Sequence, residues 1–87
     1  MHEMITPLRE DIDRMDRQLV ELLNRRAAVV LRIGQIKMGE GLQVEDISRE
    51  EDVLKQAEDS NRGPFSQNAI RNLFRAIMSE SRKLQSE

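Results

Sequence analysis

Two cations lie on the apolar face of a long helix that the first half of this sequence predicts. The apolar residues of that half recur every three or four positions: Leu8, Ile12, Met15, Leu19, Leu22, Leu23, Val30 and Ile33. Since an α-helix turns by about 100° per residue, Arg26 points in the same direction as Leu8, and Lys37 points about 20° away from it. A buried charge without a partner costs several kcal/mol, so these two cations must be paired or must serve a ligand.

The last segment of the chain also carries polar residues on its apolar face. That face consists of Ile70, Leu73, Phe74, Ile77 and Leu84. Ser81 points about 20° from Ile70, and Gln85 about 60° from it, so the face becomes polar in its last turns. The basic residues of this segment point about 100° or more away, and we expect them to be solvated: Arg71, Arg75, Arg82 and Lys83.

The middle segment supplies one carboxylate to the same set. Glu50 shares its direction with the apolar residues of this segment, whereas Arg49 lies roughly at a right angle to them. Arg9 lies at the edge of the first apolar face. Arginine and lysine side chains therefore outnumber the inward-facing acids. A bound dianion would balance the excess, and arginine forks suit carboxylates in particular.

Each of these residues also has a purely structural explanation. Arg26 alone could extend its charged end to water, and a central polar residue of a long helix could set the register of a coiled coil. Ser81 alone could be a small packing residue, and Gln85 could belong to a frayed helix end. Gly34 could allow a close backbone approach or could simply be tolerated. Taken together, polar residues on three apolar faces favour a binding site for a small anion.

Three helices must position these residues, and we predict them at about 7–38, 49–60 and 66–85. We expect the first to begin with Thr6 as N-cap and Pro7 at the first helical position, and to end at Gly39 and Gly41.

The two later helices have their own start signals. The segment from Ser48 to Glu51 fits a capping box, with Ser48 as N-cap and Glu51 reaching back to it. Residues 61–64 form a predicted turn, and Ser66 can cap the last helix. No strand-like alternation is visible, so the fold class is all-α, with one long helix and two shorter ones.

Composition limits the ways in which this chain can be stabilised. The 87 residues suit a single domain over 1–87, but only 38% are hydrophobic and 34% are charged. Cysteine is absent and the only histidine is His2, which argues against disulfides and a metal site. The first helix, roughly 48 Å long, cannot hide its apolar face against two shorter helices. A second copy of the chain is the cover that we expect.

Charge and hydropathy exclude several classes of partner. A net charge of −2 argues against nucleic-acid or acidic-membrane binding, which needs a basic face. No apolar run approaches the ~18 residues of a membrane span, and no signal peptide is visible. The expected location is the cytoplasm.

At these residues the chain resembles the all-helical (AroQ-class) chorismate mutases, over almost its whole length. The matching segments are Leu8-Arg9 with Ile12-Asp13, Leu22 to Arg26, Gly34 to Lys37, Val44 to Asp46, Arg49-Glu50, and Ser81 with Gln85. No single segment is specific, but their order and spacing are. The resemblance implies an intertwined helical homodimer with two active sites. Each site would take Arg9 from the partner, and seven residues from one protomer: Arg26, Lys37, Asp46, Arg49, Glu50, Ser81 and Gln85.

The resemblance also implies the reaction, a Claisen rearrangement of chorismate to prephenate in phenylalanine and tyrosine biosynthesis. This reaction needs no nucleophile, metal or organic cofactor. Arg9 and Arg26 would hold the two carboxylates with help from Ser81, and Lys37 and Gln85 would face the ether oxygen. Two more residues are assigned by the same resemblance. Glu50, with the backbone near Asp46, would accept a hydrogen bond from the ring hydroxyl, and Arg49 would support these groups.

Three alternatives remain from the sequence. An isochorismate pyruvate lyase of the same fold would hold the same kind of dianion. A regulatory or interaction domain of a larger shikimate-pathway enzyme would bind a related ligand with little turnover. A plain helical dimerisation module would need no ligand.

Overall fold

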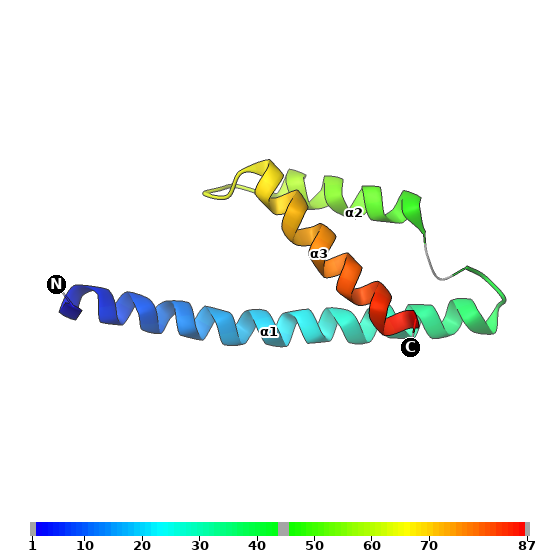
Figure 1. Ribbon diagram of the computed structural model, residues 1–87, viewed down its shortest axis with the longest axis horizontal. Helices are drawn as coiled ribbons and strands as arrows, with labels where there is room; N and C mark the ends of the chain where they lie inside the picture. Colours follow the sequence, from blue (N-terminus) through cyan, green and yellow to red (C-terminus); the bar gives the residue numbers. More distant parts are fainter. Residues whose placement is uncertain (1, 44–45, 87) are drawn as a thin grey trace.

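The computed structural model describes residues 2–43 and 46–86, and its elements are three α-helices. They are α1 (His2–Gly39), α2 (Ile47–Ser60) and α3 (Gln67–Ser86). Helices α2 and α3 form a hairpin over the C-terminal half of α1, and α3 packs against both other helices (Figure 1). The predicted all-α fold of one long and two shorter helices is confirmed. Val44 and Glu45, which belong to the predicted connector, lie outside the described residues.

The predicted start of α1 is wrong. The helix begins at His2, and Pro7 lies within it rather than at its first position. Proline lacks the N–H that would bond to the carbonyl four residues earlier, so Pro7 leaves the carbonyl of Glu3 without its helical partner. Glu3 is exposed, so water can bond this carbonyl and the helix can continue towards the N-terminus.

The end of α1 follows the predicted glycine signal. Gly41 has a φ of +72°, a left-handed conformation that a glycine adopts without a steric penalty. Its N–H donates to the Met38 carbonyl at 3.1 Å, and the N–H of Leu42 donates to the Lys37 carbonyl at 2.7 Å. This pair of bonds is the Schellman motif, which satisfies the last carbonyls of a helix.

Helix α2 begins earlier than predicted, and its cap is a different residue. Asp46 is the N-cap, and its Oδ1 accepts from the backbone N–H of Arg49 at 3.0 Å. The capping box expected from Ser48 and Glu51 is therefore wrong. Ser48 lies inside α2, and Oε2 of Glu51 lies 3.9 Å from Nη2 of Arg71 on α3. Aspartate caps a helix as well as serine does, so the earlier cap prevails.

The turn between α2 and α3 confirms the prediction for residues 61–64 and for Ser66. Asn61 donates to the Phe65 carbonyl at 2.9 Å, and its Oδ1 accepts from the N–H of Gly63 at 3.0 Å. Ser66 Oγ accepts from the N–H of Ala69 at 3.1 Å, which makes Ser66 the N-cap of α3. These bonds hold the α2–α3 hairpin closed.

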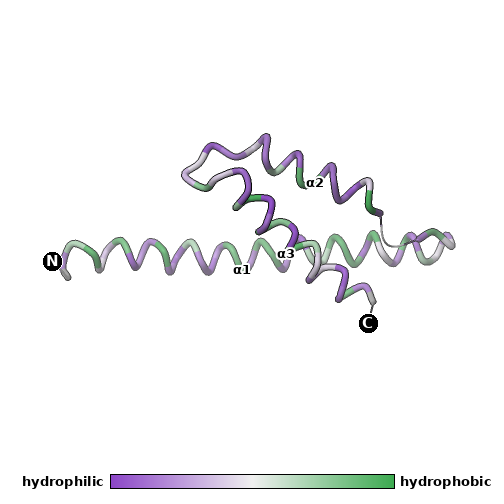
Figure 2. Tube along the Cα trace, turned by 45° about the horizontal axis from the view of Figure 1, so that its top comes forward, coloured by the Kyte–Doolittle hydropathy of each residue, from purple (hydrophilic) through white to green (hydrophobic). Residues whose placement is uncertain are grey.

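The buried core of the single chain is very small. Among the described residues, the only buried hydrophobic side chains are Leu54 and Met78, at 3% and 7% exposure. The radius of gyration is 16.6 Å, against about 12 Å for a compact chain of this length. Hydrophobic residues recur along the whole of α1 (Figure 2), and its exposed ones include Leu8, Ile12, Met15, Leu19 and Leu22. No helix in the described part of the chain could cross a membrane.

One of the basic residues expected to be solvated instead links α3 to α2. Arg71 forms an ion pair with Glu58, and both side chains are about three-quarters buried. The hydrogen bond to Glu58 raises the pKa of Arg71 above its ordinary value, although burial opposes this rise. The prediction for Arg71 was wrong because α3 packs against α2 as well as α1, so residues beside its apolar face meet another helix.

Candidate active site

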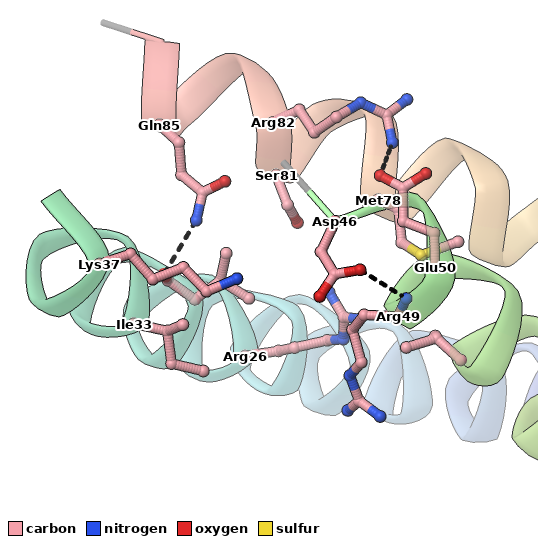
Figure 3. Close-up of a pocket in the computed structure, with 12 residues that line it drawn as sticks. Arg26, Ile33, Lys37, Asp46, Arg49, Glu50, Met78, Ser81, Arg82 and Gln85 are labelled. Atoms are coloured by element: carbon pink, nitrogen blue, oxygen red, sulfur yellow. Dashed lines mark hydrogen bonds and ion pairs between the residues drawn. The ribbon is translucent and has the colours of Figure 1, made fainter. Parts of the chain in front are cut away.

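A pocket of about 170 Å³ lies where the C-terminal half of α1, the start of α2 and the end of α3 meet. Seven of the eight predicted site residues line it: Arg26, Lys37, Asp46, Arg49, Glu50, Ser81 and Gln85. Figure 3 shows that they come from all three helices and converge on one space. The apolar part of the lining includes Val30, Ile33, Val53 and Met78. The structure therefore brings together residues that are up to 59 positions apart in the chain.

The pocket is positively charged and open to solvent. Four cationic and two anionic side chains line it, which gives a net charge of +2; they are Arg26, Lys37, Arg49, Arg82, Asp46 and Glu50. The expectation that Arg26 and Lys37 are enclosed is wrong for the single chain. Both are half-buried, and no polar or charged residue of the described part is fully buried. The reason is that, among the described residues, only α3 packs directly against α1.

The amide of Gln85 is fixed against α1 by a contact that a glycine permits. Its Nε2 donates to the Val30 carbonyl at 3.1 Å, across 55 residues of sequence. A carbonyl can only accept, so the nitrogen side of the amide must face α1. The Val30 carbonyl belongs to the helical bond with Gly34, and a Cβ at Gly34 would lie 3.0 Å from Gln85 Nε2. Gly34 therefore permits the close approach, which favours this explanation over that of a merely tolerated glycine.

Two of the predicted site residues already form hydrogen bonds to the backbone of their own helix. The carboxylate of Asp46 caps α2 through the N–H of Arg49, which fixes where α2 begins and where Glu50 stands. Ser81 Oγ donates to the Ile77 carbonyl at 2.8 Å, so its only proton is already used. Ser81 must redirect this proton if it is to donate to a bound carboxylate.

Arg82 is a pocket residue that the sequence reasoning missed. We expected it to be solvated, but its Nη1 bonds to Oε1 of Glu50, and both side chains line the pocket (Figure 3). Arg82 lies about 120° from Ile70 on α3, and Arg71 about 100°. Both residues thus lie on the side of α3 that meets α2. A signal was present in the sequence, because Met78, about 80° from Ile70, already widens the apolar face in this direction.

The eighth predicted residue does not join this pocket. Arg9 is exposed, and it lies on the N-terminal half of α1, which extends past the α2–α3 hairpin (Figure 1). Arg9 and Arg26 lie 17 residues apart on the same helix, which corresponds to roughly 26 Å along the axis. Within a single chain, Arg9 and Arg26 cannot hold the same small molecule.

The described residues offer no metal centre. Among them, no group of three or more His, Cys, Asp or Glu side chains could hold a metal ion. The polar groups that line the pocket are four cations, two carboxylates, a hydroxyl and an amide. Such a set can bind, orient and polarise an anionic ligand.

Comparison with known families gives this arrangement a context. A family described as chorismate mutase type II matches residues 8–86. The chain belongs to this family. The resemblance inferred from the sequence is thereby confirmed.

Curated relatives of the chain are longer proteins. It is 40% identical over 78 residues to a bifunctional chorismate mutase/prephenate dehydratase of Neisseria gonorrhoeae, covering 90% of the chain and 21% of that protein. It is 35% identical over 81 residues to an Aquifex aeolicus protein of the same name, covering 88% of the chain and 22% of that protein. The chain thus spans about a fifth of the length of these relatives.

Solved structures resemble the fold over nearly the whole chain. Form II of the chorismate mutase from Thermus thermophilus matches with a TM-score of 0.93 and 36% identity, covering 95% of this chain and 94% of that one. Form I of the Thermus enzyme matches with a TM-score of 0.87 and 38% identity, covering 88% and 96%. The three-helix arrangement is therefore that of a chorismate mutase domain.

Proposed function

We propose that this chain catalyses the rearrangement of chorismate to prephenate. The observation that carries the proposal is the pocket between the three helices, which gathers seven predicted site residues and has a net charge of +2. Chorismate carries two carboxylates, so this charge balances the substrate. In the reaction one C–O bond breaks and one C–C bond forms in a single cyclic shift of electron pairs. No proton, nucleophile or redox partner takes part.

The first contribution to the rate is conformational. A flexible dianion must adopt a compact geometry before its two reacting carbons meet, and holding it there removes rotational freedom in advance. Arg26 binds one carboxylate, and the partner's Arg9 binds the other. Ser81 assists after turning its proton away from the Ile77 carbonyl.

The second contribution is electrostatic. Negative charge develops on the ether oxygen as the C–O bond breaks, and fixed donors stabilise it there. Lys37 and Gln85 supply these donors: the bond to Val30 uses one N–H of the Gln85 amide and leaves the other for the substrate. Glu50, with the backbone near Asp46, accepts a hydrogen bond from the ring hydroxyl of the substrate, and Arg49 supports these groups.

We also propose that the folded unit is an intertwined homodimer with two such sites. The apolar face of α1 is exposed along its length in the single chain, and so are Leu73 and Leu84 on α3. Contiguous exposed apolar surface of this extent marks an interface, and the sequence pattern gives a second copy the same face. A partner's α1 would bring its Arg9 to the pocket that this chain leaves open. The single domain over residues 1–87 and the cytoplasmic location remain predictions.

The alternative functions have less support. An isochorismate pyruvate lyase would use the same charges, but the family description and both structural neighbours name chorismate mutase. A plain dimerisation module would not require polar donors on all three helices to face one space. A regulatory domain that binds a related ligand would require them, but the family and both structural neighbours are named for the mutase. The observations favour the mutase over all three.

The direct test is an assay of the purified chain with chorismate and identification of the product. We expect prephenate, formed at the same rate with and without EDTA, because the proposed chemistry has no step for a metal ion. Pyruvate and salicylate from isochorismate, with no prephenate from chorismate, would point to the lyase. A folded sample that converts neither compound would refute the enzyme proposal.

Mixed dimers test the shared site. Arg9→Ala and Lys37→Ala each disable both sites of their own dimer. In a heterodimer of the two variants, one site has both changes and the other has neither. Equal mixing with exchange of subunits should therefore restore about a quarter of the wild-type activity, because half of the dimers each regain one of two sites. No recovery on mixing, in samples shown to exchange subunits, would contradict the contribution of the partner's Arg9.

A further inference from the structure

Arg82 of α3 and Glu50 of α2 form an ion pair at the wall of the pocket, although 32 residues separate them in sequence. Their side chains are 40% and 28% exposed, so the pair is partly shielded from solvent. Figure 3 shows the Arg82 guanidinium beside the Glu50 carboxylate, above the space that Lys37 and Arg26 approach from α1. Arg82 is absent from the set of site residues that the family resemblance supplied.

Glu50 needs an external group to fix its carboxylate. A glutamate side chain has three rotatable torsions, and the first turn of α2 by itself fixes only where the Glu50 backbone stands. The bond from Arg82 removes this freedom, because it connects the carboxylate to a separate helix. A carboxylate can accept about four hydrogen bonds, so Glu50 keeps the capacity to accept from a ligand hydroxyl.

We propose that Arg82 is a positioning residue that aims the Glu50 carboxylate at the ring hydroxyl of the substrate and so makes this site sensitive to that hydroxyl. The inference rests on the proposed function. Arg82 does not touch the reacting bond. It acts through Glu50, and its removal affects a substrate that has a hydroxyl for Glu50 to bind far more than one that lacks it.

The alternative role for Arg82 is direct binding of a substrate carboxylate. The geometry favours the indirect role, because the guanidinium is already bonded to Glu50 and both belong to the same wall of the pocket. A direct role would require Arg82 to leave Glu50, and Glu50 would then lose the cation that offsets its charge. The two roles make different predictions for a substrate without the hydroxyl.

The test compares chorismate with an analogue that lacks the ring hydroxyl, in the full chain. Arg82→Met keeps a long unbranched side chain and good helix propensity while it removes the charge. We expect this variant to lower kcat/KM for chorismate by about 10- to 100-fold, the range found when the outer partner of a metal ligand is removed. For the analogue we expect a change below about 3-fold, measured by turnover or, if it does not react, by its inhibition constant.

Two further variants complete the experiment. Arg82→Lys retains a cation near Glu50 and should recover part of the loss. In a Glu50→Gln background, Arg82→Met should cause almost no additional loss, because the two residues act as one unit. The matched control is Lys83→Ala, which removes a neighbouring α3 cation that pairs with Glu80 at 2.9 Å outside the pocket. Lys83→Ala should leave kcat/KM for chorismate, and the value measured for the analogue, unchanged.

The outcomes separate this inference from the proposed function. If the wild-type protein does not convert chorismate, the proposed function itself fails. If it does, an equal loss on chorismate and the analogue would overturn the positioning role in favour of direct binding or a structural effect. Unchanged kinetics of Arg82→Met would overturn it as well. If Arg82→Met fails to fold, Arg82→Lys against the two substrates decides the same question.

Discussion

Replacing Gly34 by alanine should separate stability from activity in this chain. A Cβ at this position would lie 3.0 Å from Nε2 of Gln85, and 3.5 Å from its Cδ and Cγ. Ordinary contact begins near 3.4 Å, so the amide must recede by about 0.4 Å. The 3.1 Å bond from Gln85 to the Val30 carbonyl would then stretch to about 3.5 Å and be weakened or lost.

The consequences for stability nearly cancel. Alanine is better than glycine in a helix interior by about 1 kcal/mol, and a lost hydrogen bond costs about 1 kcal/mol. The clashing group is the end of a flexible side chain, so the backbone of α1 does not have to move. We expect the free energy of unfolding of Gly34→Ala to stay within about 1 kcal/mol of the wild-type value.

The consequences for catalysis do not cancel. A misplacement of 1 Å can cost about 100-fold in rate, so a shift of 0.4 Å in the donor that we propose for the ether oxygen should cost about 6-fold. In the proposed mechanism this donor acts on charge that develops in the transition state, so kcat and kcat/KM should fall together and KM should change little. The assay is initial-rate chorismate consumption, together with denaturant unfolding of the same samples.

Gly39→Ala is the matched control. Gly39 is also in α1, and a Cβ there would meet nothing within 4 Å. Gly39→Ala should keep wild-type activity. Its free energy of unfolding should rise by part of the ~1 kcal/mol by which alanine is preferred to glycine in a helix. Values of kcat that agree within about twofold for Gly34→Ala and Gly39→Ala would refute the role of Gln85 as a positioned donor.

Two other predictions concern the charges of the pocket and the cap of α3. Lys37→Ala and Arg26→Ala should each lower kcat/KM by at least about 100-fold with little change in helicity, whereas Arg25→Ala, whose side chain is exposed, should keep near-normal turnover. Wild-type turnover in both pocket variants would show that the site lies elsewhere. Ser66→Ala removes the bond to the Ala69 N–H and should lower the free energy of unfolding by about 1 kcal/mol without altering KM. An unchanged unfolding curve would show that this cap contributes nothing.

The sequence by itself determined the helices and most of the residues that line the pocket. Spacing of three and four residues specified α1 and α3, since a helix brings such positions to one face. The same periodicity distinguished Arg26 from Arg25 and placed Ser81 and Gln85 on the face that reaches the pocket. Glycine marked the end of α1, because Gly41 takes a backbone conformation that few other residues adopt.

Only the tertiary structure decided what lies beside an apolar face. A helical projection gives directions around one axis, but it does not say which neighbour occupies each direction. Helix α3 packs against two helices, so Arg71 and Arg82 pair with acids of α2 instead of facing water. The close approach of Gln85 to α1 at Gly34 likewise depends on two segments that lie 51 residues apart in the chain. These contacts follow from the packing of whole helices, which local spacing does not encode.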